Sequence, residues 1–309
     1  MAEKASDRTM TDAADRYATS SDGLRLHYRD VGRGEAGALP VVCLPGLTRT
    51  AVDFEVLAAH LSGGGAGGPR RRVLSLDYRG RGGSDHDPDA SHYSVPVEAG
   101  DVLAVLADAG IDAAVFVGTS RGGLITMVLS TVRPEVIRGA VLNDIGPVLE
   151  PAGLDRIRGY VGRLPAPKDW DDAVRTVKGY AGSQFPGLDE DDWLYFARST
   201  YAERDGVFRG RYDPALVESL RALDPAKPMP TLWPQFEGLS GVPVLVVRGE
   251  TTDLLSTETV AEMARRHPDC ALLTVPGQGH APLLHDPATL ARIAAFATRC
   301  DAAPAVGPR

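Results

Sequence analysis

The sequence predicts an α/β protein with a doubly wound, mostly parallel sheet of eight strands and an inserted helical cap. Short apolar runs that are continuous rather than alternating recur along the chain, as is typical of strands covered on both faces. Helical patterns separate these runs, and such alternation produces right-handed crossovers in a parallel sheet. One long aromatic-rich stretch lacks strand-like runs, and this stretch predicts the cap.

Each element of this fold follows from a local pattern. Six apolar runs are predicted as parallel strands: residues 40–44, 72–77, 114–117, 139–142, 242–247 and 271–275. Alternation at residues 23–30 predicts an antiparallel hairpin at the sheet edge. Helices are predicted at 53–61, 96–109, 122–132 and 287–298. The stretch 122–132 is apolar nearly all round, so we expect this helix to lie at the centre.

The cap is predicted at residues 148–238, between two parts of the core at 21–147 and 239–300. Flexible tails are expected at 1–20 and 301–309. The cap segment holds 12 of the 19 aromatic residues. One interpretation is that a small helical lid needs these side chains for its own core. The other is that some of them line a substrate cleft between cap and sheet.

Composition excludes several classes of protein. The formal charge of −8 disfavours nucleic acid and membrane surfaces as partners, since both are anionic. No apolar run approaches the ~20 residues that span a bilayer, and the first twenty residues lack the apolar centre of a secretory signal. The cysteines Cys43, Cys270 and Cys300 are odd in number and show no paired spacing. We therefore expect a reduced, cytoplasmic protein with no metal and no cofactor.

Ser120 is the predicted nucleophile. It lies in Gly-Thr-Ser-Arg-Gly at residues 118–122, directly after an apolar strand and before an apolar helix. G-x-S-x-G in this context forms a sharp strand-to-helix turn that leaves the serine hydroxyl exposed above the sheet. The alternative is a structural turn, but the flanking elements favour the nucleophile.

A serine nucleophile needs a general base within hydrogen-bond reach. His280 follows the last predicted strand, in a glycine-rich loop at the same sheet edge as Ser120. His285 is its rival and lies at the start of the C-terminal helix. We predict that His280 is the base.

The acid that orients the base is predicted to be Asp253. It follows the strand at 242–247 and gives the chain order serine, acid, histidine. Asp144 is the alternative, because it follows the strand after the nucleophile helix, in Asn-Asp-Ile-Gly-Pro at 143–147. Its other role would be capping or pairing near the cap hinge.

The backbone N–H groups of Leu47 and Arg121 are predicted to form the oxyanion hole. Leu47 lies in the loop after the first parallel strand, and Arg121 follows the nucleophile. The Arg121 side chain begins a helix, where a cation costs about 0.3–1 kcal/mol. It is expected to be solvated or paired with a carboxylate such as Asp144 or Glu150, or else to bind a carboxylate on the substrate.

Together these motifs resemble the α/β-hydrolase superfamily over residues 20 to 300. Residues 44–47 (Leu-Pro-Gly-Leu) are similar to the family's H-G-x oxyanion segment, with proline replacing histidine, and residues 77–84 resemble its D-x-R-G-x-G-x-S turn. The turn is expected to be structural, with charges that pair locally. The resemblance is greatest to capped bacterial esterases, lactonases and C–C hydrolases. Serine at position 120 departs from the aspartate that epoxide hydrolases and haloalkane dehalogenases use.

The expected activity is hydrolysis of a small carboxylic ester or lactone through an acyl-enzyme. Cleavage of a C–C bond in a β-diketone-like compound is the alternative within enzymes, because it uses the same residues. A non-catalytic ligand receptor on the same scaffold is the alternative from another class, and such a receptor has no need of the base and acid.

Overall fold

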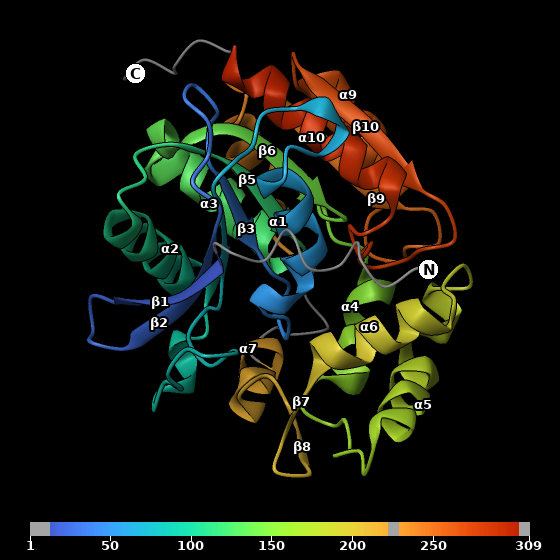
Figure 1. The fold of residues 1–309 in the computed structure, drawn as a ribbon. Coiled ribbons are helices and arrows are strands. Elements are labelled where there is room, and N and C mark those ends of the chain that lie inside the picture. Colours follow the sequence, from blue (N-terminus) through green and yellow to red (C-terminus); the bar gives the residue numbers. More distant parts are fainter. Residues whose placement is uncertain (1–12, 222–228, 303–309) are drawn as a thin grey trace, which may run out of the picture.

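The computed structural model describes residues 13–221 and 229–302 and shows an eight-stranded sheet between helices (Figure 1). The strand order is β1-β2-β4-β3-β5-β6-β9-β10. β2 pairs antiparallel with β1 and β4, and the other neighbours pair parallel. The strands are β1 (Ala13–Thr19), β2 (Arg25–Val31), β3 (Val41–Leu44), β4 (Val73–Leu76), β5 (Ala114–Thr119), β6 (Ile137–Asn143), β9 (Val244–Gly249) and β10 (Cys270–Val275). The predicted doubly wound, mostly parallel sheet is confirmed.

Helices cover both faces of the sheet, which explains the non-alternating strands. In β3, Val42 and Leu44 join one apolar cluster, whereas Val41 and Cys43 join another on the opposite face. The first face is covered by α2 (Val95–Ala109), α3 (Arg121–Val132), α8 (Trp233–Glu237) and α9 (Thr257–Arg266), and the second by α1 (Glu55–Ser62) and α10 (Pro287–Asp301). The helix α3, which follows Ser120, therefore lies in the core, as its apolar sequence predicts.

The segment between β6 and β9 carries a cap with its own apolar core of aromatic and small residues. Its elements are α4 (Pro151–Tyr160), α5 (Trp170–Ala181), α6 (Glu190–Thr200), β7 (Tyr201–Arg204), β8 (Val207–Gly210) and α7 (Val217–Arg221). They lie together on one side of the core (Figure 1). The expectation of a purely helical cap is wrong, because β7 and β8 form an antiparallel hairpin. Asp205 and Gly206 both have positive φ, as a two-residue hairpin turn requires.

The predicted tails are shorter in the structure. Residues 13–19 form β1 rather than a flexible tail, and their mostly exposed side chains explain why no apolar pattern marked the strand. At the other end α10 continues to Asp301, whose carboxylate pairs with buried Arg71 at 2.6 Å. The rest of both predicted tails, 1–12 and 303–309, lies outside the described residues.

The structure also bears on the expectations about membrane-spanning segments and cysteines. In the ranges 13–221 and 229–302, no helix is long and apolar enough to cross a bilayer. All three cysteines are free thiols, and Cys43 and Cys300 are buried.

Candidate active site

The strand order brings three loops together at the carboxyl edge of the sheet. β5 lies between β3 and β6, so the loops that follow these three strands are neighbours. They carry Leu47 after β3, Ser120 after β5 and Asp144 after β6. Parallel strands place their following loops at one edge, which is where α/β proteins bind ligands.

Ser120 occupies a strained turn between β5 and α3. Its φ of 50° and ψ of −109° are unusual for a residue with a side chain. The turn needs glycine beside it, because a Cβ on Gly122 would lie 2.1 Å from the carbonyl oxygen of Leu44. This is the geometry of a nucleophile elbow, which presents the serine hydroxyl above the sheet.

His280 connects Ser120 to an acid. Its Nε2 lies 2.8 Å from the hydroxyl oxygen of Ser120, and its Nδ1 lies 2.8 Å from Oδ2 of Asp144. A carboxylate accepts the Nδ1 hydrogen, which leaves Nε2 with a lone pair directed at the serine hydroxyl. The rival His285 lies elsewhere, bonded to Asp192 of the cap at 2.6 Å.

Asp144 is fully buried and held from several sides. Besides His280, it accepts hydrogen bonds from the backbone N–H of Gly249 at 2.8 Å and from the hydroxyl of Thr252 at 2.6 Å. These donors fix the orientation of the carboxylate toward the imidazole. Thr252 is a supporting residue that no sequence motif marked as part of the site.

The prediction that Asp253 contacts His280 is wrong in this structure. Asp253 instead forms a bidentate ion pair with Arg156 of cap helix α4, at 2.7 and 2.8 Å. Burial raises the pKa of the Asp253 carboxyl, but the Arg156 guanidinium outweighs burial and lowers this pKa overall. The local contacts of the two acids account for the difference: Gly249 and Thr252 donate to Asp144 beside His280, whereas the Arg156 guanidinium holds Asp253. The alternative acid, Asp144, is the residue that contacts His280.

The two backbone N–H groups predicted for the oxyanion hole are free to bind a ligand. Across the described part of the chain, no hydrogen bond uses the N–H of Leu47 or of Arg121. Leu47 lines the same pocket as Ser120, and Arg121 is the first residue of α3. Two unpartnered N–H groups near Ser120 can donate hydrogen bonds to an oxygen on which negative charge develops.

The Arg121 side chain turns away from this pocket. Its Nε donates to the fully buried carboxylate of Glu98 at 2.7 Å, and a terminal nitrogen donates to the carbonyl of Tyr93 at 2.9 Å. The expected ion pair is therefore present, but its partner is Glu98 and neither Asp144 nor Glu150. The Arg121 guanidinium is paired with Glu98 and is not among the groups that line the pocket, so it is not placed to bind a substrate carboxylate.

Two other arginines line the pocket at Ser120, together with apolar and aromatic side chains of the cap. Arg156 comes from α4, and Arg49 follows Leu47 and pairs with Asp53 at 2.7 Å. The lining cap aromatics are Tyr160, Tyr180, Phe185, Tyr195, Phe196 and Tyr212. Phe185 and Phe196 also belong to the cap's own core. The cap aromatics thus build the cap's own core and also line the pocket, and their contact with a substrate stays a prediction.

The turn at residues 77–84 binds its own neighbours, as expected. The Asp77 carboxylate accepts from the N–H groups of Ala51 and Gly83 at 2.7 and 2.9 Å, and His27 lies 2.7 Å from it. The Ser84 hydroxyl donates to the Asp77 carbonyl at 2.7 Å. These contacts give the turn a structural role.

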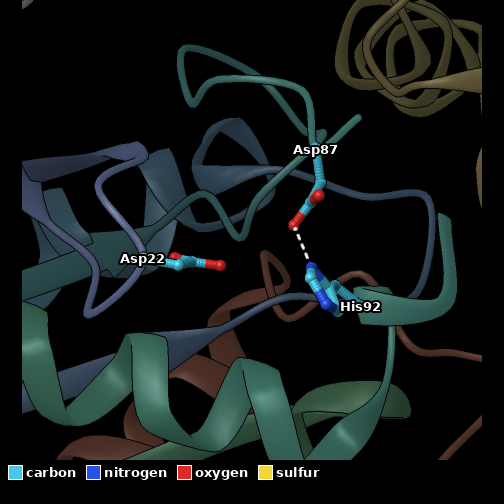
Figure 2. Close-up of side chains that lie close together, drawn as sticks. All are labelled: Asp22, Asp87 and His92. Atoms are coloured by element: carbon cyan, nitrogen blue, oxygen red, sulfur yellow. Dashed lines mark hydrogen bonds and ion pairs between the residues drawn. The ribbon is translucent and has the colours of Figure 1, made fainter. Parts of the chain in front are cut away.

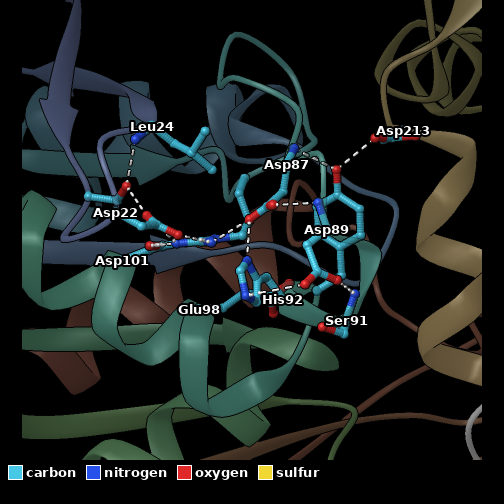
Figure 3. Close-up of polar contacts among 12 residues, drawn as sticks. Asp22, Leu24, Asp87, Asp89, Ser91, His92, Glu98, Asp101 and Asp213 are labelled. Carbon is cyan, nitrogen blue, oxygen red and sulfur yellow. Dashed lines mark hydrogen bonds and ion pairs between the residues drawn. The ribbon is translucent and has the colours of Figure 1, made fainter.

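Asp22, Asp87 and His92 form a cluster with the spacing of metal ligands (Figure 2). These three residues are not among those that line the pocket at Ser120. A cation of the protein already lies among these acids. The Arg79 guanidinium donates to Asp22 at 2.8 Å, to Asp87 at 2.6 Å and to Asp101 at 2.6 and 2.7 Å; Figure 3 shows the three acids. Arg79 thus supplies one positive charge that stabilises three carboxylates, and it occupies the space between them.

Residues 41–293 match the model of the Alpha/beta hydrolase family, and the chain belongs to this family. Among curated proteins it is 35% identical to the 3-hydroxybutyrate-oligomer hydrolase of Cupriavidus necator, over 89% of this chain and 93% of that protein. It is 28% identical to the 2-(acetamidomethylene)succinate hydrolase of Mesorhizobium japonicum, over 84% of this chain and 90% of that protein. A crystal structure of an alpha/beta hydrolase from Novosphingobium aromaticivorans is 42% identical, with a TM-score of 0.85, and covers 94% of this chain and 99% of that one. The chain is therefore similar in sequence and structure to hydrolases over nearly its full length.

Proposed function

We propose that this hydrolase cleaves a small carboxylic ester through an acyl-enzyme on Ser120. The observation that carries the proposal is the hydrogen-bonded series Ser120, His280 and Asp144. Ser120 attacks the ester carbonyl while Nε2 of His280 takes the hydroxyl proton. Asp144 stabilises the resulting imidazolium and keeps Nδ1 protonated.

The remaining steps use the same groups. The N–H groups of Leu47 and Arg121 hold the oxyanion of the tetrahedral intermediate. His280 returns its proton to the leaving alcohol, and the acyl group stays on Ser120. A water molecule then attacks the acyl-enzyme, His280 takes its proton, and the carboxylic acid is released as Ser120 regains its hydrogen.

For the substrate we propose a short ester that bears a carboxylate, with the linear dimer of 3-hydroxybutyrate as the first compound to test. The relative from Cupriavidus necator supports this choice by its name. The cavity at Ser120 is about 90 Å³ and has mainly apolar walls, which suits a short acyl chain. Arg49 and Arg156 add two guanidinium groups to these walls. Each is paired with an aspartate but also lines the pocket, unlike Arg121, so a substrate carboxylate would share its guanidinium with Asp53 or Asp253.

Turnover by the purified chain tests this function. The substrates are p-nitrophenyl acetate, the 3-hydroxybutyrate dimer, a lactone and a β-diketone. We expect hydrolysis of both esters, a mass increase of one acyl group on Ser120 after rapid quenching, and a loss of about 10⁴- to 10⁶-fold in Ser120→Ala. Unchanged turnover in Ser120→Ala, or cleavage of the β-diketone alone, would refute ester hydrolysis. A ligand receptor would turn over none of the four.

The cytoplasmic location and the lack of nucleic-acid and membrane partners stay predictions that depend on the acidic charge and the cysteine pattern.

A further inference from the structure

A buried charged network links the two residues whose N–H groups we assign to the oxyanion hole. Its centre is Glu98 on α2, a carboxylate with no exposed surface. One oxygen of Glu98 accepts from Nε of Arg121 at 2.7 Å, and the other accepts from a terminal nitrogen of Arg81 at 2.7 Å. Glu98 thus holds the side chain of the residue that follows the nucleophile.

Arg81 extends the network to the other side of the hole. Its side chain is fully buried, and its Nε donates to the carbonyl oxygen of Leu47 at 2.9 Å. A terminal nitrogen of Arg81 also donates to the carbonyl of Arg79 at 2.7 Å, which anchors the guanidinium in its own turn. Leu47, Arg81, Glu98 and Arg121 therefore form one continuous series of hydrogen bonds.

Stability alone does not explain this arrangement. Two cations and one anion are taken out of water, and apolar residues of similar volume are often equally stable or more so at such sites. One terminal nitrogen of Arg81 is buried without a hydrogen-bond partner, which carries a further penalty. Burial raises the pKa of Glu98, but the charges of Arg81 and Arg121 outweigh burial and lower it overall, so Glu98 stays ionised.

We propose that Glu98 and Arg81 are positioning residues that hold the backbones of Leu47 and Arg121 where both N–H groups meet the oxyanion. This inference rests on the proposed function, because the oxyanion arises only in acyl transfer. Fixed donors need no reorganisation as charge develops, and a displacement of about 1 Å in such a site lowers the rate by about 100-fold.

Kinetics of Glu98→Gln test the inference. We expect kcat for p-nitrophenyl acetate to fall about 10- to 100-fold with KM nearly unchanged, because the lost alignment matters only in the transition state. Asp101→Asn is the matched control: Asp101 lies on the same helix (Figure 3), is also buried, and pairs with Arg79 without contacting Leu47 or Arg121. The control should lose stability but keep kcat.

A second measurement separates positioning from folding and from the proposed function. Amide hydrogen exchange is measured on peptides that cover residues 44–54 and 118–126, at a temperature where both variants are folded. We expect faster exchange in Glu98→Gln than in Asp101→Asn. Equal exchange together with equal kcat overturns the inference. If the wild type shows no turnover that depends on Ser120, the proposed function fails, and exchange alone then decides: faster exchange supports positioning and equal exchange overturns it.

Discussion

Nδ1 of His280 lies 2.8 Å from a carboxylate oxygen of Asp144, at the end of the strand next to the nucleophile strand. Asp253 forms a different interaction. Asp253 joins the core to the cap through Arg156, whose guanidinium also lines the pocket at Ser120. Of the two acids considered from the sequence, Asp144 thus contacts His280 and Asp253 contacts Arg156 of the cap.

The pocket arginines should select for charge. Arg156→Met is expected to lower kcat/KM about 10- to 100-fold for the 3-hydroxybutyrate dimer and much less for p-nitrophenyl acetate, since hydrogen bonds to charged groups contribute about 1.5–3 kcal/mol. Steady-state kinetics on both esters give the ratio of the two kcat/KM values, dimer to p-nitrophenyl acetate. Arg158→Met, on the same helix but outside the pocket lining, is the control and should leave the ratio unchanged. Equal losses on both esters in Arg156→Met would contradict a carboxylate-binding role.

The elbow should tolerate no side chain at position 122. A Cβ there meets the backbone oxygen of Leu44 at 2.1 Å, so Gly122→Ala is expected to destabilise the fold by about 1–3 kcal/mol, as measured by urea unfolding. Gly100→Ala is the control, because Gly100 lies within α2 with nothing near its would-be Cβ. That change should stabilise by about 0.5–1 kcal/mol. A Gly122→Ala protein as stable as the wild type would show that the turn is looser than described.

The cluster around Arg79 should stabilise the fold in a pH-dependent way. The hydrogen bonds from Arg79 are the main reason that the pKa of Asp22 falls from 3.8 to about 2. Because the folded pKa is below the unfolded one, the stabilisation is complete above pH 3.8 and is lost as the pH falls through about 2. The Tm difference between wild type and Asp22→Asn should therefore be constant from pH 7 to pH 5 and shrink between pH 4 and pH 2. A Tm difference that grows as the pH falls would contradict a lowered pKa of Asp22 in the folded protein.

The same cluster should not respond to metal ions. Arg79 already donates to Asp22, Asp87 and Asp101, so a divalent cation would have to displace a guanidinium. Adding calcium or zinc ions, or EDTA, is expected to leave Tm within error of the untreated protein. A rise of several degrees with one of the ions would show that the cluster binds it.

The fold was largely predictable because local patterns determine it. Runs such as residues 40–44 and 114–117 are buried on both faces, and this burial requires continuous apolar sequence. β1 was missed because its side chains are mostly exposed, so it is ordered by backbone pairing with β2 and not by an apolar pattern. The β7–β8 hairpin was missed although Asp205-Gly206 is a turn signal, because its strands are short and mostly exposed.

The contact between Ser120 and His280 was predictable from motifs, whereas the acid beside His280 was not. Asp144 and Asp253 both follow strands in suitable loops. The contacts that hold them, Thr252 with Asp144 and Arg156 with Asp253, join residues far apart in sequence, so only the structure shows which acid lies beside His280. Glu98, Arg49 and Arg156 were not predicted as site residues, since long charged side chains on helices and loops are usually solvated. Their partners lie far away in sequence, so only the three-dimensional structure shows that they are buried or line the pocket.

Asp144, and not Asp253, is expected to complete the catalytic series with His280 and Ser120. The direct measurement compares kcat for p-nitrophenyl acetate in Asp144→Asn and Asp253→Asn, because the charge of Arg156 cannot act on this neutral ester through a substrate carboxylate. We expect a loss of about 10⁴-fold in Asp144→Asn, because the amide no longer holds the imidazole in the correct tautomer. We expect a loss of less than about tenfold in Asp253→Asn. A large loss in Asp253→Asn, with Asp144→Asn near the wild-type rate, would show that Asp253 is the acid.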